Sequence, residues 1–190
     1  MQYNTVKWAD VSVKDWNSAK AFYAAMFDWV FVDQYFEGRV VYSLACLDES
    51  AEPPESTSVA GLGPSMQSEA SDKLRYWRSY INVPDIAATI EKIDAAQGQV
   101  IMPPMDVMDA GVMSVCTDPN GVEFSLWQPV SHAGPEVRNI PGMICWFELT
   151  SSDPKQSIEF YGAVFGWTAD ERRTSPNLSL IHISEPTRPY

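Results

Sequence analysis

The stretch WADVSVKDWNSAKAFYAAMFDW, residues 8–29, decides the fold, because it returns as WFELTSSDPKQSIEFYGAVFGW at residues 146–167. The two copies align without a gap at an offset of 138 residues. The matched pairs are Trp8 and Trp146, Asp10 and Glu148, Asp15 and Asp153, Phe22 and Phe160, Tyr23 and Tyr161, Phe27 and Phe165, and Trp29 and Trp167. So many aromatic and acidic matches in one register indicate a duplicated unit.

Each copy begins with the pattern of a strand and continues with that of a helix. Residues 6–13 alternate in polarity and include β-branched side chains, which predicts a strand. Asp15 and Asp153 follow as helix N-caps, and Pro154 suits a first helical position. Apolar residues then recur at helical spacing, so each copy is expected to form an amphipathic helix whose aromatic residues are core.

A fainter repeat lies between residues 6 and 128, where Asp85 matches Asp15 at an offset of 70 residues. A strand is predicted over residues 75–83, and a helix follows that ends at Gly98 in the left-handed conformation. Three strands are expected after each helix, at residues 30–36, 39–47 and 57–62 and then at 100–102, 112–117 and 122–128. The unit strand–helix–three strands therefore occurs twice between residues 6 and 128.

This doubled βαβββ unit, with the turn and strand TDPNGVEFSLWQP at residues 117–129, resembles the vicinal oxygen chelate superfamily. That superfamily contains glyoxalases, bleomycin-resistance proteins and extradiol dioxygenases, and these motifs, together with residues 145–167, resemble the two-domain glyoxalase-like proteins common in bacteria. The resemblance implies an α+β fold in which paired βαβββ modules form a curved mixed sheet, the cup, with helices on the outside. We expect a first glyoxalase-like domain at residues 1–129, a linker at 130–142 and a partial second domain at 143–177.

The end of the sequence departs from these patterns. Residues 178–188, LSLIHISEPTR, resemble the translation of a transposase sequencing adapter, so we expect 178–190 to be a non-native tail; the alternative is a genuine divergent terminus. The strand expected at 143–150 and the helix from Pro154 would then lack the strands that complete their sheet. We therefore expect an exposed sheet edge and helix face, self-association through this incomplete domain, and lower solubility than for a chain ending near Val130.

Composition narrows the function classes. The formal net charge of −12 argues against nucleic acid or an anionic membrane surface as a partner. The N-terminal ten residues show no secretory signal and no run is long enough to span a bilayer, so a soluble, cytoplasmic protein is expected. The three cysteines are far apart and odd in number, which favours reduced thiols buried in strands.

The resemblance also locates where metal-using members hold their metal, on the first and last strands of each half. Carried onto this sequence, these positions hold Trp8, Arg78 and Ser125, and Arg78 would repel a divalent cation. The only histidines are His132, expected to be solvated in the linker, and His182 in the suspected tail. We therefore expect no metal and no cofactor, since the two-histidine-one-carboxylate iron site of dioxygenases cannot be assembled.

Strand alternation predicts which side chains line the cup. The candidate ligand-binding residues are Trp8, Asp10, Arg78, Tyr80, Glu123, Ser125 and Trp127. Aromatic area together with a few oriented charges suits a small organic ligand. The alternative is structural, with Asp10 and Arg78 forming an ion pair and the tryptophans serving as core. Glu123 would act as a general base if desolvated, but no second catalytic partner is evident, so whether a reaction is catalysed stays open.

The preferred hypothesis is a glyoxalase-like small-molecule binding protein without a catalytic metal, similar to the bleomycin-resistance branch. One alternative is a metal-dependent lyase or isomerase resembling glyoxalase I. The other is a structural interaction module whose cup is filled by its own side chains.

Overall fold

The computed structural model describes residues 3–51, 53–64, 76–135, 140–175 and 178–184. The chain is of mixed α+β class and forms two compact units that do not follow the order of the sequence. The module-one unit contains residues 7–79 and 134–147, and the module-two unit contains residues 1–6, 80–133 and 148–190. Each unit is described by itself below.

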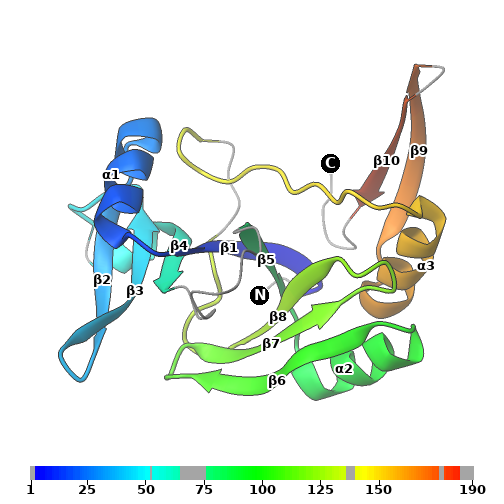
Figure 1. Cartoon of the computed structure of the whole chain (residues 1–190), viewed down its shortest axis with the longest axis horizontal. Helices are drawn as coiled ribbons and strands as arrows, with labels where there is room; N and C mark the ends of the chain where they lie inside the picture. The colour runs from blue at the N-terminus through cyan, green and yellow to red at the C-terminus, as the bar shows by residue number, and fades with distance from the viewer. Residues whose placement is uncertain (1–2, 52, 65–75, 136–139, 176–177, 185–190) are drawn as a thin grey trace. The chain divides into compact units, whose positions relative to one another are not determined.

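The module-one unit contains the first βαβββ module (Figure 1). Its elements are β1 (Thr5–Val13), α1 (Trp16–Phe27), β2 (Val30–Phe36), β3 (Arg39–Cys46), a 3-10 helix η1 (Pro54–Thr57) and β4 (Ser58–Pro64). The strands follow the order β2-β3-β4-β1, with β4 parallel to β1 and the other neighbours antiparallel. Its small core is formed by Trp29, Ala45, Val59 and Ala60.

The module-two unit repeats this topology. It contains the second half of β5 (Trp77–Asn82), whose first three residues belong to the module-one unit, and then α2 (Ile86–Ala95), β6 (Gln99–Val107), β7 (Gly111–Thr117) and β8 (Glu123–Pro129). The strands follow the order β5-β8-β7-β6, with β5 parallel to β8 and the other neighbours antiparallel. The predicted doubled βαβββ unit and the α+β class are therefore confirmed.

The three α-helices begin as the sequence predicts, at an aspartate whose carboxylate accepts a backbone N–H three residues later. Asp15 accepts from the amide of Ser18 at 3.0 Å, Asp85 from Ala88 at 2.9 Å and Asp153 from Gln156 at 3.1 Å. Each bond satisfies one of the N–H groups that a helix start leaves without an intrahelical acceptor.

The end of α2 differs from the prediction. Gln97 takes the left-handed conformation, with φ of 67°, and Gly98 does not. The requirement for glycine at position 98 is steric instead. A Cβ there would lie 2.7 Å from Ile93 Cγ2, 2.7 Å from the carbonyl oxygen of Thr117 and 2.9 Å from Phe160 Cε2. A glycine in this position permits close packing between elements.

The helix of the second repeat, α3 (Pro154–Phe165), packs into the core of the module-two unit. The rings of Phe160 and Phe165 lie 6.1 and 6.0 Å from the ring of Phe124 on β8, measured between centroids. The expectation that this helix face would be exposed is therefore wrong, because α2 and β8 cover it.

The strand expected at residues 143–150 is also wrong, since this segment has no regular secondary structure. Its counterpart in the first repeat, β1, pairs with β4, whereas residues 143–150 have no strand partner among the described residues. A strand without hydrogen-bonded neighbours is not stable. After α3 the chain forms β9 (Thr168–Ser175) and β10 (Leu178–Ser184), which pair antiparallel with each other. The end of the suspected tail, 185–190, and the side chain of His182 lie outside the described residues.

The beginning of the presumed linker is folded onto the module-two unit. The backbone amides of Val130, Ser131 and His132 all donate to the carbonyl oxygen of Ala110, at 2.9, 3.1 and 3.1 Å. His132 is partly buried, and burial lowers the pKa of its imidazole. The expectation of a solvated histidine is wrong, because these backbone bonds hold it against the sheet.

The cysteines are free, but they do not share one environment. Cys46 on β3 and Cys116 on β7 are buried, as predicted, and burial raises the pKa of each thiol to about 11. Cys145 is exposed and lies outside any strand, which corrects the prediction for the third thiol.

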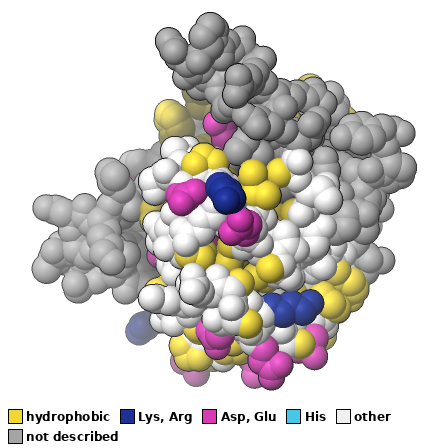
Figure 2. Space-filling model, turned by 90° about the vertical axis from the view of Figure 1, so that its right-hand side faces the viewer, with side chains coloured by type: hydrophobic (Ala, Val, Ile, Leu, Met, Phe, Trp, Pro, Cys, Tyr) yellow, Lys and Arg dark blue, Asp and Glu magenta, His cyan; other side chains and the backbone are white. Residues whose placement is uncertain are grey.

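Two further surface properties follow from the described residues. No helix within these ranges combines the length and apolar character needed to cross a lipid bilayer. Acidic side chains are spread among hydrophobic ones over the face shown in Figure 2, in keeping with the net charge of −12.

Candidate functional site

The seven residues predicted to line the ligand site divide between the two units. Trp8, Asp10 and Arg78 belong to the module-one unit. The module-two unit holds the rest, which are Tyr80, Glu123, Ser125 and Trp127.

In the module-one unit, a tyrosine connects two of the predicted residues. The hydroxyl of Tyr42, on β3, donates a hydrogen bond to Asp10 Oδ2 at 3.1 Å and accepts one from the indole Nε1 of Trp8 at 3.0 Å. Trp8 is 7% exposed and Asp10 is 9% exposed, so this array is held away from bulk water. Trp8 and Asp10 therefore share one face of β1, as strand alternation predicts, and Tyr42 holds both.

Tyr42 reaches this place because β4 carries a glycine opposite Asp10. In the parallel pairing of β1 and β4, Asp10 lies beside Gly61. A Cβ on Gly61 would lie 1.8 Å from the Tyr42 hydroxyl oxygen and 2.3 Å from its Cζ. Because no side chain could occupy that space together with the tyrosine, Gly61 and Tyr42 form one packing arrangement.

Arg78 lies on β5 between Trp77 and Ser79 and is partly buried. Trp77 packs in this unit against Tyr23 and Trp29, with ring centroids 5.4 and 6.2 Å apart. This packing fixes the backbone from which the Arg78 guanidinium extends.

In the module-two unit, three of the predicted residues lie together on neighbouring strands. Tyr80 of β5 pairs in register with Ser125 of β8, and the rings of Tyr80 and Trp127 meet edge to face at 6.4 Å. Trp127 also donates its indole N–H to the carbonyl oxygen of His132 at 2.8 Å. Glu123 lies at the start of β8, half-buried. Tyr80, Ser125 and Trp127 thus form a buried patch on one face, with an aromatic corner.

The family's metal site can be tested against these positions. The fainter repeat relates Asp10 to Tyr80, and their parallel partners are Gly61 and Ser125, so Gly61 is the counterpart of Ser125. The four positions where metal-using members would hold a metal are therefore Trp8, Gly61, Arg78 and Ser125. An indole and a guanidinium only donate hydrogen bonds, a glycine brings no side chain, and a lone hydroxyl is a poor metal ligand.

The rest of the donor set gives the same result. Across the described ranges, no group of three or more His, Cys, Asp or Glu residues is placed to hold a metal ion. The residues present therefore do not fit a divalent metal at the family's position.

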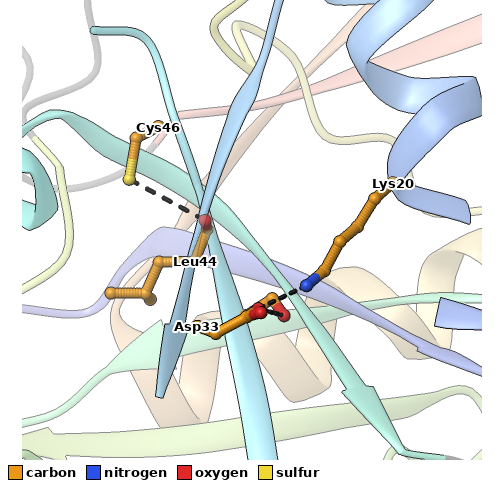
Figure 3. A network of polar contacts seen from close by, with 5 residues as sticks. Lys20, Asp33, Leu44 and Cys46 are labelled. Carbon is orange, nitrogen blue, oxygen red and sulfur yellow. Dashed lines mark hydrogen bonds and ion pairs between the residues drawn. The ribbon is translucent and has the colours of Figure 1, made fainter. Parts of the chain in front are cut away.

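A separate open groove lies between α1 and β2, with a volume of about 720 Å³. Lys20 of α1 forms an ion pair with Asp33 of β2 (Figure 3). The hydroxyl of Ser43 donates to the same carboxylate at 2.5 Å. Burial pushes the pKa of Asp33 upward, but the hydrogen bonds from Lys20 and Ser43 and the ammonium charge outweigh it, so that the pKa is lowered. These contacts hold α1 to β2 along the wall of the groove.

Tyr42 and Gly61 were not among the predicted site residues. A glycine inside a strand signals close approach by another group, and Gly61 and Gly63 in an apolar strand carried that signal. The sequence did not show which side chain would approach, because Tyr42 lies 19 positions before Gly61 on another strand.

Comparison with known proteins agrees with the fold. Residues 5–126 match the family model described as Glyoxalase/Bleomycin resistance protein/Dioxygenase superfamily. The chain is 36% identical over 165 residues to the putative glyoxylase CFP32 of Mycobacterium tuberculosis, covering 86% of this chain and 60% of that protein. It is 37% identical over 90 residues to the anthracycline biosynthesis protein DnrV of Streptomyces peucetius, covering 47% of this chain and 33% of that protein. The chain therefore spans less than two thirds of the length of either relative.

Among solved structures, a Mn(II)-bound glyoxalase from Novosphingobium aromaticivorans matches with a TM-score of 0.59 at 16% identity, covering 88% of this chain and 54% of that one. A methylmalonyl-CoA epimerase in complex with methylmalonyl-CoA matches with a TM-score of 0.51 at 12% identity, covering 70% of this chain and all of that one. At these identities the likeness supports the fold alone. From the family match over residues 5–126, the chain belongs to the glyoxalase/bleomycin-resistance/dioxygenase superfamily, which the sequence patterns already resembled.

Proposed function

We propose that this protein binds a small organic molecule without the help of a divalent metal, in the manner of the bleomycin-resistance branch of its family. The observation that carries the proposal is the position of Tyr42. Its hydroxyl fills the space beside Gly61 and is bonded to Trp8 and Asp10. An acidic ligand residue at position 61 could not be present together with this tyrosine.

The chemistry of the proposed site favours an aromatic ligand that carries an acidic group. Within the module-one unit, Trp8 offers aromatic surface, and Arg78 offers a guanidinium that binds carboxylates with two parallel hydrogen bonds. The relatives named as anthracycline biosynthesis proteins, DauV and DnrV, support a fused-ring aromatic compound as the ligand class.

A metal-dependent lyase or isomerase is the second candidate, because a relative that is 36% identical is named a putative glyoxylase. The donor chemistry at Trp8, Gly61, Arg78 and Ser125 speaks against it. A structural module is the third, supported by the burial of Trp8, Tyr80 and Trp127.

Elemental analysis separates the first two candidates. After dialysis against metal-free buffer and then after incubation with excess manganese, zinc or nickel, the purified protein should hold well under one equivalent of each. One tightly held equivalent that is lost in Asp10→Asn or Glu123→Gln would overturn the proposal and favour the lyase.

Ligand titration separates the first candidate from the third. Anthraquinone-2-carboxylate is a suitable probe, because it is planar, aromatic and anionic, and binding near the indole ring of Trp8 should quench the intrinsic fluorescence. Arg78→Ala should weaken binding about tenfold or more, since a charge-assisted hydrogen bond contributes about 1.5–3 kcal/mol. Arg39→Ala, which removes an exposed arginine from β3, is the matched control and should leave the affinity unchanged. Binding that is equally strong in both variants would refute the assignment of Arg78, and no binding at all would favour the structural module.

A further inference from the structure

One hairpin of the module-two unit holds half of the methionines of the chain. Of the eight methionines in the sequence, Met102, Met105, Met108 and Met113 lie on β6, on β7 or in the turn between them. These two strands run side by side, in green, in Figure 1. Strands favour β-branched and aromatic side chains, so strand propensity does not account for this clustering. What distinguishes methionine from those residues is its polarizable thioether sulfur.

The pairing of the two strands brings three of these side chains to one face of the sheet. Met105 lies opposite Met113, and Met102 lies opposite Val115. Because positions 113 and 115 are two residues apart on β7, their side chains share a face, and so do those of their partners on β6. The register shift between Met102 and Met105 makes this possible, because it absorbs one extra residue of β6. We call Met102, Met105 and Met113 the methionine cluster.

The three thioethers of the cluster can reach one point. Residues directly opposite in an antiparallel pair have Cβ atoms about 4.5–5.5 Å apart, and diagonal neighbours are about 7–8 Å apart. A methionine side chain is unbranched and flexible, so two sulfurs can meet an ion between such positions. Met105 is 41% exposed, and Met102 and Met113 are partly buried. A small ion can therefore reach the sulfurs from solvent while the paired strands hold their positions.

The surroundings of the cluster are aromatic rather than acidic. Met113 lies in register with Trp127 of β8, so the indole is beside the cluster on the same face, and its N–H donates to the carbonyl oxygen of His132 at 2.8 Å. Asp106, the acidic residue within β6, pairs with Val112 and therefore points to the other face. Hard cations need several oxygen ligands, and the described part of the chain holds no group of three or more His, Cys, Asp or Glu residues suited to a metal ion.

We propose that the methionine cluster binds one Cu(I) ion through the thioether sulfurs of Met102, Met105 and Met113. Soft thioether ligands select Cu(I), whereas hard divalent cations are held by carboxylate, carbonyl and water oxygens. The ring of Trp127 adds an aromatic face, which attracts a cation. The sulfur ligands differ from the residues of the proposed organic-ligand site in the module-one unit, so either proposal can fail without the other.

The thiols must first be kept out of the measurement, because thiolates also bind Cu(I). Cys145 is exposed, so every titration is made in the full chain carrying Cys145→Ser. Cys46 and Cys116 are buried, and burial raises the pKa of each thiol to about 11, so neither presents a thiolate near neutral pH. Ag(I) is a redox-stable probe of the same soft chemistry. Calorimetric titration with silver nitrate in chloride-free buffer should show one equivalent bound.

Methionine methyl resonances identify the ligands without any change to the cluster. In the chain labelled with methyl-¹³C methionine, Ag(I) should shift the resonances of Met102, Met105 and Met113 and leave that of Met108 in place. Cu(I), added as its acetonitrile complex without oxygen, should shift the same three. Shifts spread over all the methionines would mean adventitious binding and would overturn the proposal.

Substitution by leucine removes the sulfur and keeps an apolar side chain of similar volume. Since removing a residue that only supports a metal ligand typically costs about 10–100-fold in affinity, Met105→Leu and Met113→Leu should each weaken Ag(I) binding about tenfold or more. The matched control is Met108→Leu in the turn after β6, where the side chain is 57% exposed, and it should leave the affinity unchanged. The proposal is overturned if the chain carrying Cys145→Ser binds neither ion, or if Met108→Leu weakens binding as much as Met105→Leu. Equally strong binding of zinc at the cluster would also refute it.

Discussion

Replacing Gly61 with alanine tests whether Tyr42 occupies the position assigned to it. The added Cβ would lie 1.8 Å from the Tyr42 hydroxyl oxygen, 2.3 Å from Cζ and 2.7 Å from Cε1, so the ring must leave. It would lose its hydrogen bond with the indole of Trp8, which contributes about 1 kcal/mol, and its bond to the Asp10 carboxylate, which contributes about 1.5–3 kcal/mol. Gly61→Ala should therefore lower the free energy of unfolding by about 3 kcal/mol.

The matched control is two residues away. A Cβ on Gly63 would lie 3.5 Å from Tyr42 Cε2, an ordinary contact, so Gly63→Ala should cost little. In a Tyr42→Ala background the collision at Gly61 is absent, and Gly61→Ala should be neutral or stabilising by up to about 1 kcal/mol. Urea denaturation followed by tryptophan fluorescence gives the four free energies, and a coupling of about 2–3 kcal/mol between positions 42 and 61 is expected. Equal costs of Gly61→Ala in the two backgrounds would refute the packing of Tyr42 over Gly61.

Three other predictions concern the thiols, the histidine and the second repeat. Under native conditions near neutral pH, a thiol reagent should label only one cysteine per chain, the exposed Cys145, because burial raises the pKa of the other two thiols to about 11. In denaturant it should label all three cysteines. Labelling of Cys46 or Cys116 as fast as Cys145 would contradict this prediction. Burial lowers the pKa of the His132 imidazole below its usual value of 6.5, so the unfolded chain binds a proton at this side chain more readily than the folded chain does. The free energy of unfolding should therefore decrease as the pH falls below 6.5. His132→Gln should flatten that part of the unfolding curve against pH, whereas an unchanged slope would show that the imidazole is not desolvated. A chain ending at Val130 lacks α3 and exposes Phe124 and Ile93, so it should be less stable and more prone to associate than the 190-residue chain. This order is the reverse of the one that the sequence predicts. If size-exclusion chromatography shows a monomer and thermal unfolding shows equal stability, α3 does not contribute to the stability of this unit.

Much of the fold could be predicted from the sequence because its signals are local. An aspartate before an apolar helical stripe marks a helix start, and Asp15, Asp85 and Asp153 all cap as expected. Alternation in β-branched residues marked most strands of the two modules to within two residues, but it predicted only residues 100–102 of the strand Gln99–Val107. The misplaced strand at 143–150 has the same local signal, but a strand also needs neighbours, and those depend on distant parts of the chain.

The candidate site was less predictable for the same reason. Alternation correctly placed Trp8 and Asp10 on one face of β1, where Tyr42 bonds to both. It did not identify Tyr42, because the approach of a β3 side chain to a β4 glycine depends on the register between strands. After the end of α2, the sequence pattern predicts a conformational role for Gly98, whereas the structure shows a steric role imposed in part by Phe160, which is distant in the sequence.

The apolar stripe of the repeat shows most clearly where sequence reasoning stops. Identical spacing in α1 and α3 predicts that both faces are buried, but it does not say against what. In α3 the face meets Phe124 and Ile93, which belong to the first domain by sequence, and Trp167 anchors on Asn4 at the start of the chain. Because each repeat depends on residues of the other, the compact units cross the boundaries that the sequence suggests at residues 129 and 143. A chain shortened within that linker would lose both Gly142, whose carbonyl oxygen accepts the indole N–H of Trp29, and α3, which packs against Ile93 and Phe124. The order of the modules along the chain therefore differs from the way in which they pack.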